Sequence, residues 1–535
     1  MAFGNKANTP SFVVERKMYL KQSDYCFLEK IMNVCNKMYN TGVKHYLTVL
    51  NTFHSDARFL SAFNSIKELL DKRNSISDNK ELNAELKLYY KSIDDLIKEY
   101  GLKEKDIHQY FCQLKNRSYQ NCLSIDIIQK LGSELYQAIE DCIYSLKKTI
   151  HYRKRGQTTT ISGKKNGSGI KYDPATDTVY FDLHFKRKAT LKTIRQKDVY
   201  LKEAMLNKVK YCRIVRKPFG KQYRYFVQLV MEGKPPIKQR VKGKGAVGVD
   251  PGVSIVAYSN DKTARFVQLA EGVERYDKRI KVLSRQIERS LRINNPDCYD
   301  ENGVAIKGKK PTNYTNGYCD AIMKLKTVYR KRSEFILLSH RTLANQIASI
   351  ADTVIIEPMD YKALQKKVKQ TQRQDKPSTI TKKDGSIITI HKYKRKKRVG
   401  SSIDRRSPAT FCNILEDKIY SNGGKVVKVN CTKYKASQYN HITKEATKSL
   451  LSNRTKLIGS NLVQRDLYSS FLLYNIKDNE NIDFDACNLN FNKFLELQQQ
   501  VVEEIKTKGD TTKNFGLKDF IEYENNNKKF FVVKL

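Results

Sequence analysis

The sequence contains no tryptophan, no cysteine pair in a CxxC spacing and no long apolar run. Its 11 cysteines are irregularly placed, which argues against a zinc ribbon and against a disulfide framework. We therefore expect a reducing, cytoplasmic environment. The lack of any apolar stretch of about 18 residues excludes a membrane-spanning helix, and residues 1–10 lack the apolar core of a secretion signal. The eight histidines form no HxxxH or HExxH pattern, which argues against a histidine-based metal site.

Acidic residues are few relative to basic ones. The 535 residues include 100 Lys and Arg but only 56 Asp and Glu, so the formal charge is +44. Such an excess indicates a polyanionic partner rather than a particular fold. Nucleic acid is the expected polyanion, because each Lys or Arg that displaces a counterion from the nucleic acid strengthens binding. A membrane surface is the alternative.

The predicted secondary structure of the first half of the chain changes once, from helices to strands. Residues 11–20 predict a short strand, and from Ser23 apolar residues recur at three- and four-residue steps, which predicts helix. Helical patterns continue through 60–71, 80–100 and 127–150. From about residue 156, turn residues separate runs of Thr, Tyr and Val, which predicts a small basic antiparallel β domain that extends to about residue 232.

The second half alternates short strands with helices. Three strands joined by tight turns are expected first, then two helices around a polar segment, a strand, a basic region with a hairpin at Asp384-Gly385, and a final helix–strand–helix series. The expected ranges are strands at 246–250, 253–258, 263–268, 353–357 and 424–430, and helices at 271–291, 320–350, 408–420 and 461–475. The polar remainder has one helical pattern, at 489–506.

Three acids occupy unusual positions. Asp250 ends the apolar strand AVGVD, Glu357 ends the strand TVIIE, and Asp466 lies early in the amphipathic segment VQRDLYSSFLL. Acids at apolar strand ends are costly unless they are solvated, paired or bound to a cation. Taken singly, each has an ordinary explanation: an Asp-Pro-Gly turn, a surface acid, or an ion pair with Arg465. Their order within the pattern of strands and helices favours a shared functional site.

This order resembles that of a RuvC-like nuclease of the RNase H fold. GVDPGVSIVAYS is similar to its first motif, IIEPMDY to its second and QRDLYSSFLL to its third. The preceding strand, helical region and β domain resemble the plan of TnpB proteins and compact type V CRISPR effectors. The resemblance implies an α+β multidomain protein with a helical recognition lobe, a β-barrel-like wedge domain and a RuvC-like nuclease domain. It also implies a prokaryotic, nucleoid-associated setting.

The resemblance divides the chain into segments. It implies a first wedge strand at 1–22, a helical recognition lobe at 23–155, a β wedge domain at 156–240, and a split nuclease domain at 246–475. Within the nuclease domain it implies a basic lid at 364–406 and, at 431–460, an insert in the position of a zinc ribbon that lacks CxxC pairs. Residues 476–535 form a tail to which we assign no role.

The same resemblance implies an activity and its cofactors. Asp250, Glu357 and Asp466 would be both the catalytic residues and the ligands of two magnesium ions, with Asp250 shared by the two ions. A metal-activated water would attack the phosphodiester. No zinc is expected. The partners implied are a guide RNA and target double-stranded DNA recognised through a short flanking motif. The oligomeric state is not determined by the sequence.

Basic residues near the acids are candidate nucleic-acid contacts. Arg454 would reach the scissile phosphate if the insert folds over the cleft. The run at 391–400 is expected to contact phosphates beside the cleft, although a solvated loop is the ordinary explanation of such a run. Its candidate residues are Lys392, Lys394, Arg395, Lys396, Lys397 and Arg398.

Two other functions compete with RNA-guided cleavage. One is an RNA-guided DNA-binding repressor that does not cut, although retention of all three acids argues against it. The other is an unguided RuvC-like resolvase or transposase, for which about 245 residues before the first motif are hard to explain.

Overall fold

The computed structural model describes residues 10–73, 80–118, 123–146, 148–154, 156–167, 169–182, 184, 186–236, 242–301, 303–365, 377–381, 386–390, 399–430, 436–447, 453–477, 481–508 and 517. The chain forms two compact units, Met1–Pro236 and Ile237–Leu535. Both helices and several sheets are present, so the chain is a mixed α and β protein, as expected. Among the described helices, none has the length and apolar character needed to cross a membrane.

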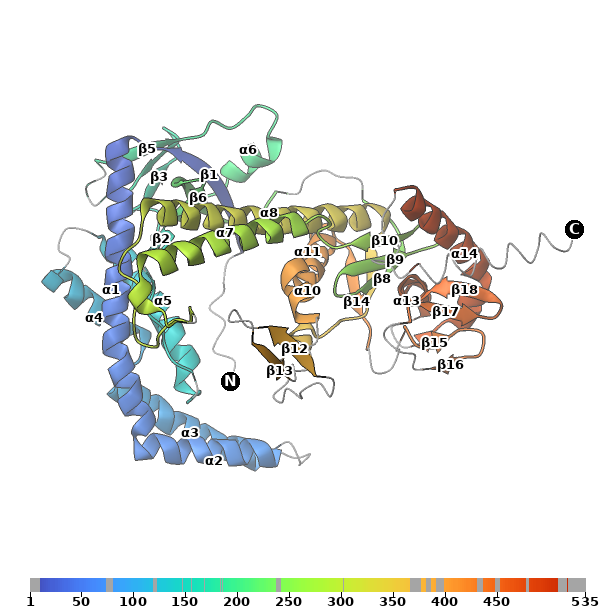
Figure 1. Cartoon of the computed structure of the whole chain (residues 1–535), viewed down its shortest axis with the longest axis horizontal. Coiled ribbons are helices and arrows are strands. Elements are labelled where there is room, and N and C mark those ends of the chain that lie inside the picture. The colour runs from blue at the N-terminus through green and yellow to red at the C-terminus, as the bar shows by residue number, and fades with distance from the viewer. Residues whose placement is uncertain are drawn as a thin grey trace, which may run out of the picture. The chain divides into compact units, whose positions relative to one another are not determined.

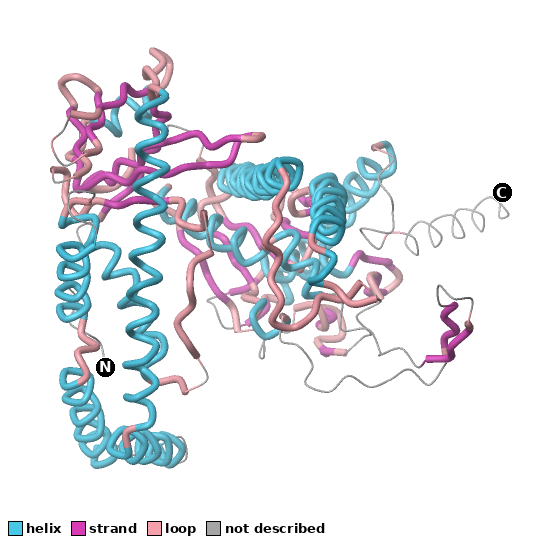
Figure 2. The backbone as a smooth tube through the Cα atoms, turned by 60° about the vertical axis from the view of Figure 1, so that its left-hand side comes forward, coloured by secondary structure: helices cyan, strands magenta, loops and turns pink. Residues whose placement is uncertain are grey.

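The helices of the first unit are arranged along α1 (Gln22–Ser55), which is 34 residues long. Its buried side chains follow the predicted helical periodicity and include Leu28, Met32 and Cys35. Two helices pack together at the end of α1 that lies away from the strands (Figures 1 and 2); they are α2 (Ala57–Arg73) and α3 (Lys80–Glu99). The other two are α4 (Glu104–Ser118) and α5 (Ile125–Ile143), and α5 ends before the predicted limit of residue 150.

The strands of the first unit form a seven-stranded sheet in the order β2-β6-β7-β1-β5-β4-β3, and all its pairings are antiparallel. The edge strand β3 also approaches β6, so the sheet curls back toward its other edge. The strands are β1 (Ser11–Tyr19), β2 (Thr160–Ser162), β3 (Lys171–Asp173), β4 (Thr178–Tyr180), β5 (Lys188–Leu191), β6 (Val209–Phe219) and β7 (Gln222–Glu232), with α6 (Val199–Met205) between β5 and β6.

One hydrophobic core runs through both the helices and the sheet of this unit. It includes Val14 of β1, Met32 of α1, Leu135 of α5 and Val227 of β7. The sequence pattern suggested a separate helical lobe and β domain, because periodicity changes abruptly near residue 156. Periodicity reports which face of an element is buried but not which element covers it, so a shared core is not visible in the sequence.

The second unit is built on a five-stranded sheet with the order β10-β9-β8-β11-β14. The first three strands are antiparallel neighbours in chain order, whereas β11 is parallel to both β8 and β14. These strands are β8 (Ala246–Pro251), β9 (Ile255–Ser259), β10 (Ala264–Gln268), β11 (Thr353–Ile356) and β14 (Lys425–Lys428). They coincide closely with the five predicted strand ranges.

Helices cover both faces of this sheet. The long helices α7 (Glu274–Asn294) and α8 (Asn316–Ile350) pack side by side (Figure 1). Helices α8 and α11 (Pro408–Ser421) cover one face, and α13 (Arg465–Tyr474) and α14 (Phe484–Thr507) cover the other. The remaining short helices are η1 (Pro296–Cys298), α9 (Tyr361–Leu364) and α10 (Val399–Arg406).

Four two-stranded hairpins complete the described part of the second unit. They are β12 (Ser378–Thr381) with β13 (Ile387–Ile390), β15 (Tyr439–Asn440) with β16 (Glu445–Ala446), β17 (Thr455–Ile458) with β18 (Asn461–Gln464), and β19 (Ile476–Lys477) with β20 (Asn481–Ile482). The pairing of β12 with β13 confirms the hairpin predicted around Asp384-Gly385, whose turn lies outside the described residues.

Two segments differ from the sequence expectation. Residues 461–464 are a strand rather than the start of a helix, because Gly459, at a φ of 59°, forms the turn that pairs β18 with β17. The segment after residue 475 is more than a tail, since α14 packs against α13 and β10. Its Phe494 and Val502 belong to the same core as Phe266 of β10. The unit therefore extends to at least residue 507.

Candidate active site

The alternation of side chains along β8 and β11 directs two of the acids to the same face of the sheet. Val247 and Val249 of β8 pack with α8 and α11, and so do Val354 and Ile356 of β11. Successive strand residues point to opposite faces, so Asp250, and Glu357 just past the end of β11, point toward the α13 face. Because β8 and β11 are parallel neighbours, the two acids follow adjacent strand ends.

Gly248 allows α13 to lie directly on β8. A Cβ atom at this position would lie 2.0 Å from the carbonyl oxygen of Ser470 and 2.4 Å from the amide nitrogen of Tyr474. No side chain larger than hydrogen fits there unless α13 moves away. The Ser470 hydroxyl is within 2.9 Å of the Ser259 hydroxyl on β9, which fixes the helix on the sheet. This close approach brings the third acid beside the first.

Asp466 lies in the first turn of α13, where the helix dipole stabilises a negative charge. The side chain of Gln464 caps this helix by accepting a 2.7 Å hydrogen bond from the amide of Leu467. Gln464 is in turn held by Gln498 of α14, whose side-chain oxygen accepts from its backbone amide at 2.8 Å. The position of Asp466 thus depends on a residue in the segment first taken for a tail.

The three acids interact electrostatically. Burial raises the pKa of the Asp250 carboxyl, and the negative charges of Asp466 and Glu357 raise it further, to about 8. Arg465 and the Ser469 hydroxyl act in the opposite direction. Ser469 is fully buried, three residues after Asp466 on the same face of α13, and its hydroxyl lacks a well-formed hydrogen bond to any described residue. With this pKa, the Asp250 carboxyl holds its proton at neutral pH, and a bound cation would favour its ionised form.

Two arginines bind the Asp466 carboxylate. Arg454 donates from one guanidinium nitrogen to Oδ2 at 3.2 Å, and Arg465 donates to Oδ1 at 3.2 and 3.3 Å. Arg454 immediately precedes β17, and its side chain is 46% exposed, whereas that of Arg465 is 10% exposed. The predicted phosphate contact, Arg454, is therefore placed at the acid cluster, bound to one of the acids.

A tyrosine connects the segments that carry the other two acids. Tyr361, four residues after Glu357, donates a hydrogen bond of 2.7 Å to the carbonyl oxygen of Pro251, which directly follows Asp250. Asp360 caps the short helix α9 that holds this tyrosine, accepting from the amide of Ala363 at 2.9 Å. The IIEPMDY segment thus both supplies an acid and anchors the loop that carries it.

The structure brings together Asp250, Glu357, and Asp466 with Arg454, from three separate parts of the chain. The candidate basic residues of the lid, Lys392, Lys394, Arg395, Lys396, Lys397 and Arg398, lie outside the described residues. The sequence analysis gave no role to Tyr361 or Ser469. Both lie inside the motifs already singled out, IIEPMDY and QRDLYSS, so the motif boundaries were the available signal.

The donors at this site fit a hard divalent cation in chemistry and in charge, since carboxylate oxygens are the ligands that Mg²⁺ prefers. However, these donor atoms do not surround a single position at which one ion could bind. Among the described residues, no three His, Cys, Asp or Glu side chains are grouped tightly enough to hold one metal ion. Each oxygen of Asp466 accepts hydrogen bonds from an arginine, which holds the carboxylate in its present orientation. Turning toward a shared metal would weaken these contacts.

His441 of the insert is used structurally. Its ring nitrogen Nδ1 is 2.7 Å from the Tyr468 hydroxyl, which also accepts from the His441 backbone amide at 3.1 Å. The ring packs against Phe471 and Phe491, and burial lowers the pKa of His441 to about 4. A neutral histidine thus joins the insert to α13 and α14.

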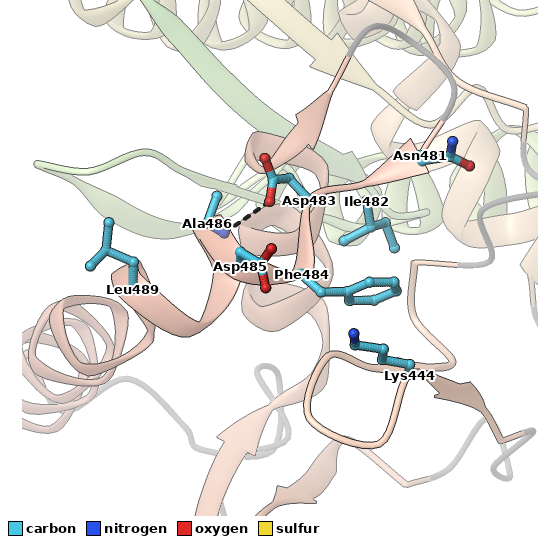
Figure 3. Close-up of a pocket in the computed structure, with 8 residues that line it drawn as sticks. All are labelled: Lys444, Asn481, Ile482, Asp483, Phe484, Asp485, Ala486 and Leu489. Atoms are coloured by element: carbon cyan, nitrogen blue, oxygen red, sulfur yellow. Dashed lines mark hydrogen bonds between the residues drawn. The ribbon is translucent and has the colours of Figure 1, made fainter.

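A separate pocket of about 600 Å³ lies at the start of α14 and is lined by none of the three acids (Figure 3). Lys444 points toward the Phe484 ring, with its ammonium nitrogen 5.7 Å from the ring centroid. Asp483 accepts a 3.0 Å hydrogen bond from the amide of Ala486 as the cap of α14. Because its polar groups serve to start the helix, this pocket adds nothing to the acid cluster.

Comparison with known proteins gave no family. No protein-family model matches the sequence, and no curated protein matches it significantly. Among solved structures, a Cas12f1–sgRNA–target DNA complex is similar at a TM-score of 0.38 and 12% identity, over 88% of this chain and 99% of that chain. A CRISPR-Cas12f ternary complex has a TM-score of 0.28 and 12% identity, over 86% of each chain. Similarities this low assign neither a fold nor a function to the chain.

Proposed function

We propose that this protein is a metal-dependent, RNA-guided DNA endonuclease with a RuvC-like active site. The observation that carries the proposal is the convergence of Asp250, Glu357 and Asp466. Asp250 lies near the end of β8, Glu357 directly follows the adjacent parallel strand β11, and Asp466 lies in the first turn of the helix packed on this sheet, in the chain order that the sequence motifs suggested. Acids from such distant segments have no structural need to lie close together, and carboxyls that raise one another's pKa in this way are typical of functional sites.

The proposed chemistry is phosphodiester hydrolysis. When bound, two magnesium ions would supply an activated water and stabilise the leaving oxygen. Asp250, Glu357 and Asp466 would supply the carboxylate ligands of these ions. Tyr361 would keep the segment of Glu357 against the end of β8 through its bond to Pro251. Arg454 would be available to a phosphate once it leaves Asp466.

The proposed partners are a guide RNA and double-stranded DNA. The net charge of +44 supports a polyanionic partner, and the separate 236-residue unit before the sheet of the acids supports a task beyond hydrolysis. In guided nucleases, base pairing with the guide reads the target sequence, while the protein contacts the sugar–phosphate backbone of the duplex. The guided step rests on the motif resemblance described above.

Sequencing of co-purified RNA tests the guide, and a cleavage assay tests the site. The full chain, expressed with its native flanking DNA, is expected to carry one dominant RNA with a constant part and a variable part. DNA matching the variable part should be cut in Mg²⁺ by the wild type and not by Asp250→Ala, which should still bind it. Random or absent RNA would contradict guiding, and cleavage by the variant would contradict the assignment of the acids.

One observation favours a second function, RNA-guided DNA binding without cleavage. Both oxygens of Asp466 accept hydrogen bonds from arginines. Among the described residues, no three His, Cys, Asp or Glu side chains are grouped closely enough to hold a metal ion. The same assay separates the two functions. A wild-type chain that retains its RNA and binds matched DNA, but leaves it uncut in Mg²⁺ and Mn²⁺, would be a binder.

A further inference from the structure

The two arginines that bind Asp466 face each other across a hairpin. β17 and β18 pair with Thr455 opposite Gln464, so Arg454 and Arg465 are the next facing residues. The ladder continues through them, because the amide of Arg465 donates to the carbonyl oxygen of Arg454 at 2.9 Å. Like charges directly opposite each other in an antiparallel ladder are destabilising. This pair therefore needs an anion.

Asp466 is that anion in the structure. Each of its two oxygens is taken by a different guanidinium, Oδ2 by Arg454 and Oδ1 by Arg465. Arg465 is nearly buried and also donates to the carbonyl oxygen of Asn453 at 2.9 Å, so it is fixed in place. A buried arginine that loses its counter-ion is strongly destabilising. Turning Asp466 away from Arg465 toward a metal is therefore costly, and another anion in its place would offset that cost.

We propose that a phosphate of the nucleic acid replaces Asp466 between Arg454 and Arg465, and that this exchange frees Asp466 to complete the divalent-cation site. The inference rests on the proposed function and adds to it a coupling between substrate and metal. Guanidinium groups bind phosphate as well as carboxylate, in the same bidentate manner. The exchange keeps the arginine pair neutralised in both states, and only the identity of its anion changes.

This coupling has a thermodynamic consequence. If phosphate helps the metal to bind, the metal must help phosphate to bind by the same factor. Metal affinity should thus be weak in the free chain and rise when nucleic acid is present. The half-exposed Arg454 is the member of the pair that can move, so it sets the strength of the competition. Without Arg454, Asp466 should be easier to release, and the benefit of phosphate should shrink.

Manganese binding measures the exchange without relying on cleavage. We would titrate Mn²⁺ into the full chain and follow free Mn²⁺ by electron paramagnetic resonance, with and without a six-nucleotide thymidylate whose phosphorothioate linkages resist hydrolysis. The oligonucleotide should tighten Mn²⁺ binding to the wild type by about fivefold or more. Arg454→Gln alone should bind Mn²⁺ about two- to fivefold more tightly than the wild type. It should also respond much less to the oligonucleotide.

Arg265→Gln is the matched control. Arg265 also belongs to the second unit, pairs with Glu504 at 3.1 Å and is 42% exposed, close to the 46% of Arg454. This variant loses the same charge and should behave as the wild type. Thermal unfolding of each variant verifies that it is folded, and Arg454→Lys, which keeps the charge, should restore part of the oligonucleotide effect.

The outcomes distinguish the exchange from the proposed active site. If Asp250→Asn binds Mn²⁺ as the wild type does, the metal site itself is misplaced and the proposed function fails with it. If Asp250→Asn loses Mn²⁺ while Arg454→Gln matches the wild type with and without oligonucleotide, the site stands and the exchange is overturned. An equal response of Arg265→Gln and Arg454→Gln would mean that only net charge matters, which also overturns the exchange.

Discussion

The hydroxyl of Tyr361 donates a 2.7 Å hydrogen bond to the carbonyl oxygen of Pro251, and this bond joins the two segments that carry the first and second acids. The tyrosine is buried, with 7% of its surface exposed, so the bond is shielded from water. It fixes the loop after β11 against the end of β8. The distance between Asp250 and Glu357 therefore depends on a residue that takes no part in chemistry.

Tyr361→Phe should reduce both stability and cleavage. Removing the hydroxyl leaves a buried carbonyl oxygen without this donor, which should cost about 1–2 kcal/mol in the free energy of unfolding. The looser loop should lower the cleavage rate more than it lowers DNA affinity. Urea unfolding and single-turnover cleavage measure the two effects. Tyr420→Phe, at a position 52% exposed, is the control and should change neither.

Asp250→Asn should stabilise the metal-free protein while abolishing cleavage. The wild-type carboxyl is buried beside the charges of Asp466 and Glu357, and the neutral amide of nearly equal shape removes that repulsion. We expect a gain of about 1–3 kcal/mol in the free energy of unfolding in EDTA, as is common where a functional group is held at a cost to stability. Urea unfolding with EDTA measures it. A variant less stable than the wild type would indicate that Asp250 has a structural role.

The sequence predicted much of this site because its signals are local. The apolar runs in AVGVD and TVIIE predict short strands that end at Asp250 and Glu357, and the order of the motifs predicts that these acids belong to one domain. The ion pair of Asp466 with Arg465 was one ordinary explanation of this acid, and the structure contains it; the contacts with Arg454 could not be predicted in this way. They depend on Arg454 and Arg465 facing each other across a hairpin whose second strand, β18, takes up residues 461–464 of the segment that was predicted as helix.

The role of α14 could not be predicted from the sequence either. Its apolar stripe predicts a helix near residues 489–506 but not its partner. In the structure Gln498 reaches the amide of Gln464 and so orients the start of α13. Long-range polar contacts of this kind leave no periodic trace, because any exposed glutamine would look the same in the sequence.

His441 should make the second unit less stable in mild acid. Its pKa is lowered to about 4 in the folded chain, against about 6.5 when unfolded, so the unfolded state binds the proton more readily between these values. The stability contributed by the neutral ring is complete above pH 6.5 and is lost as the pH falls toward 4. Between pH 6.5 and 5 the loss should approach about 2 kcal/mol.

Comparison with His441→Phe isolates this effect from other titrating groups. Phenylalanine suits the aromatic surroundings of Phe471 and Phe491 but cannot accept a proton. The variant should be less stable than the wild type at pH 7.5, because it loses the contact with the Tyr468 hydroxyl. The difference between the two proteins should narrow at pH 5 in urea unfolding. A constant difference at both pH values would show that His441 does not titrate in this range.

A row of basic side chains on α7 should contribute to the salt dependence of nucleic-acid binding. Lys278, Lys281, Arg285 and Arg289 are exposed and recur at three- and four-residue steps, so they lie along one side of the helix. Within the described chain, the structure records no ion pair for them. Each phosphate that such a residue neutralises releases a counterion and makes the logarithm of affinity depend more steeply on salt.

Changing Lys281, Arg285 and Arg289 to Gln should make that dependence less steep. The slope of the logarithm of affinity against the logarithm of salt concentration should fall by about one for each residue that contacts phosphate. Fluorescence anisotropy of a labelled duplex, measured with the full chain at several salt concentrations, gives the slope. Lys493→Gln on α14 is the control, because Lys493 already pairs with Glu496 at 2.9 Å. An unchanged slope in the triple variant would assign this face of α7 to solvent, and the excess charge that binds nucleic acid would then lie elsewhere.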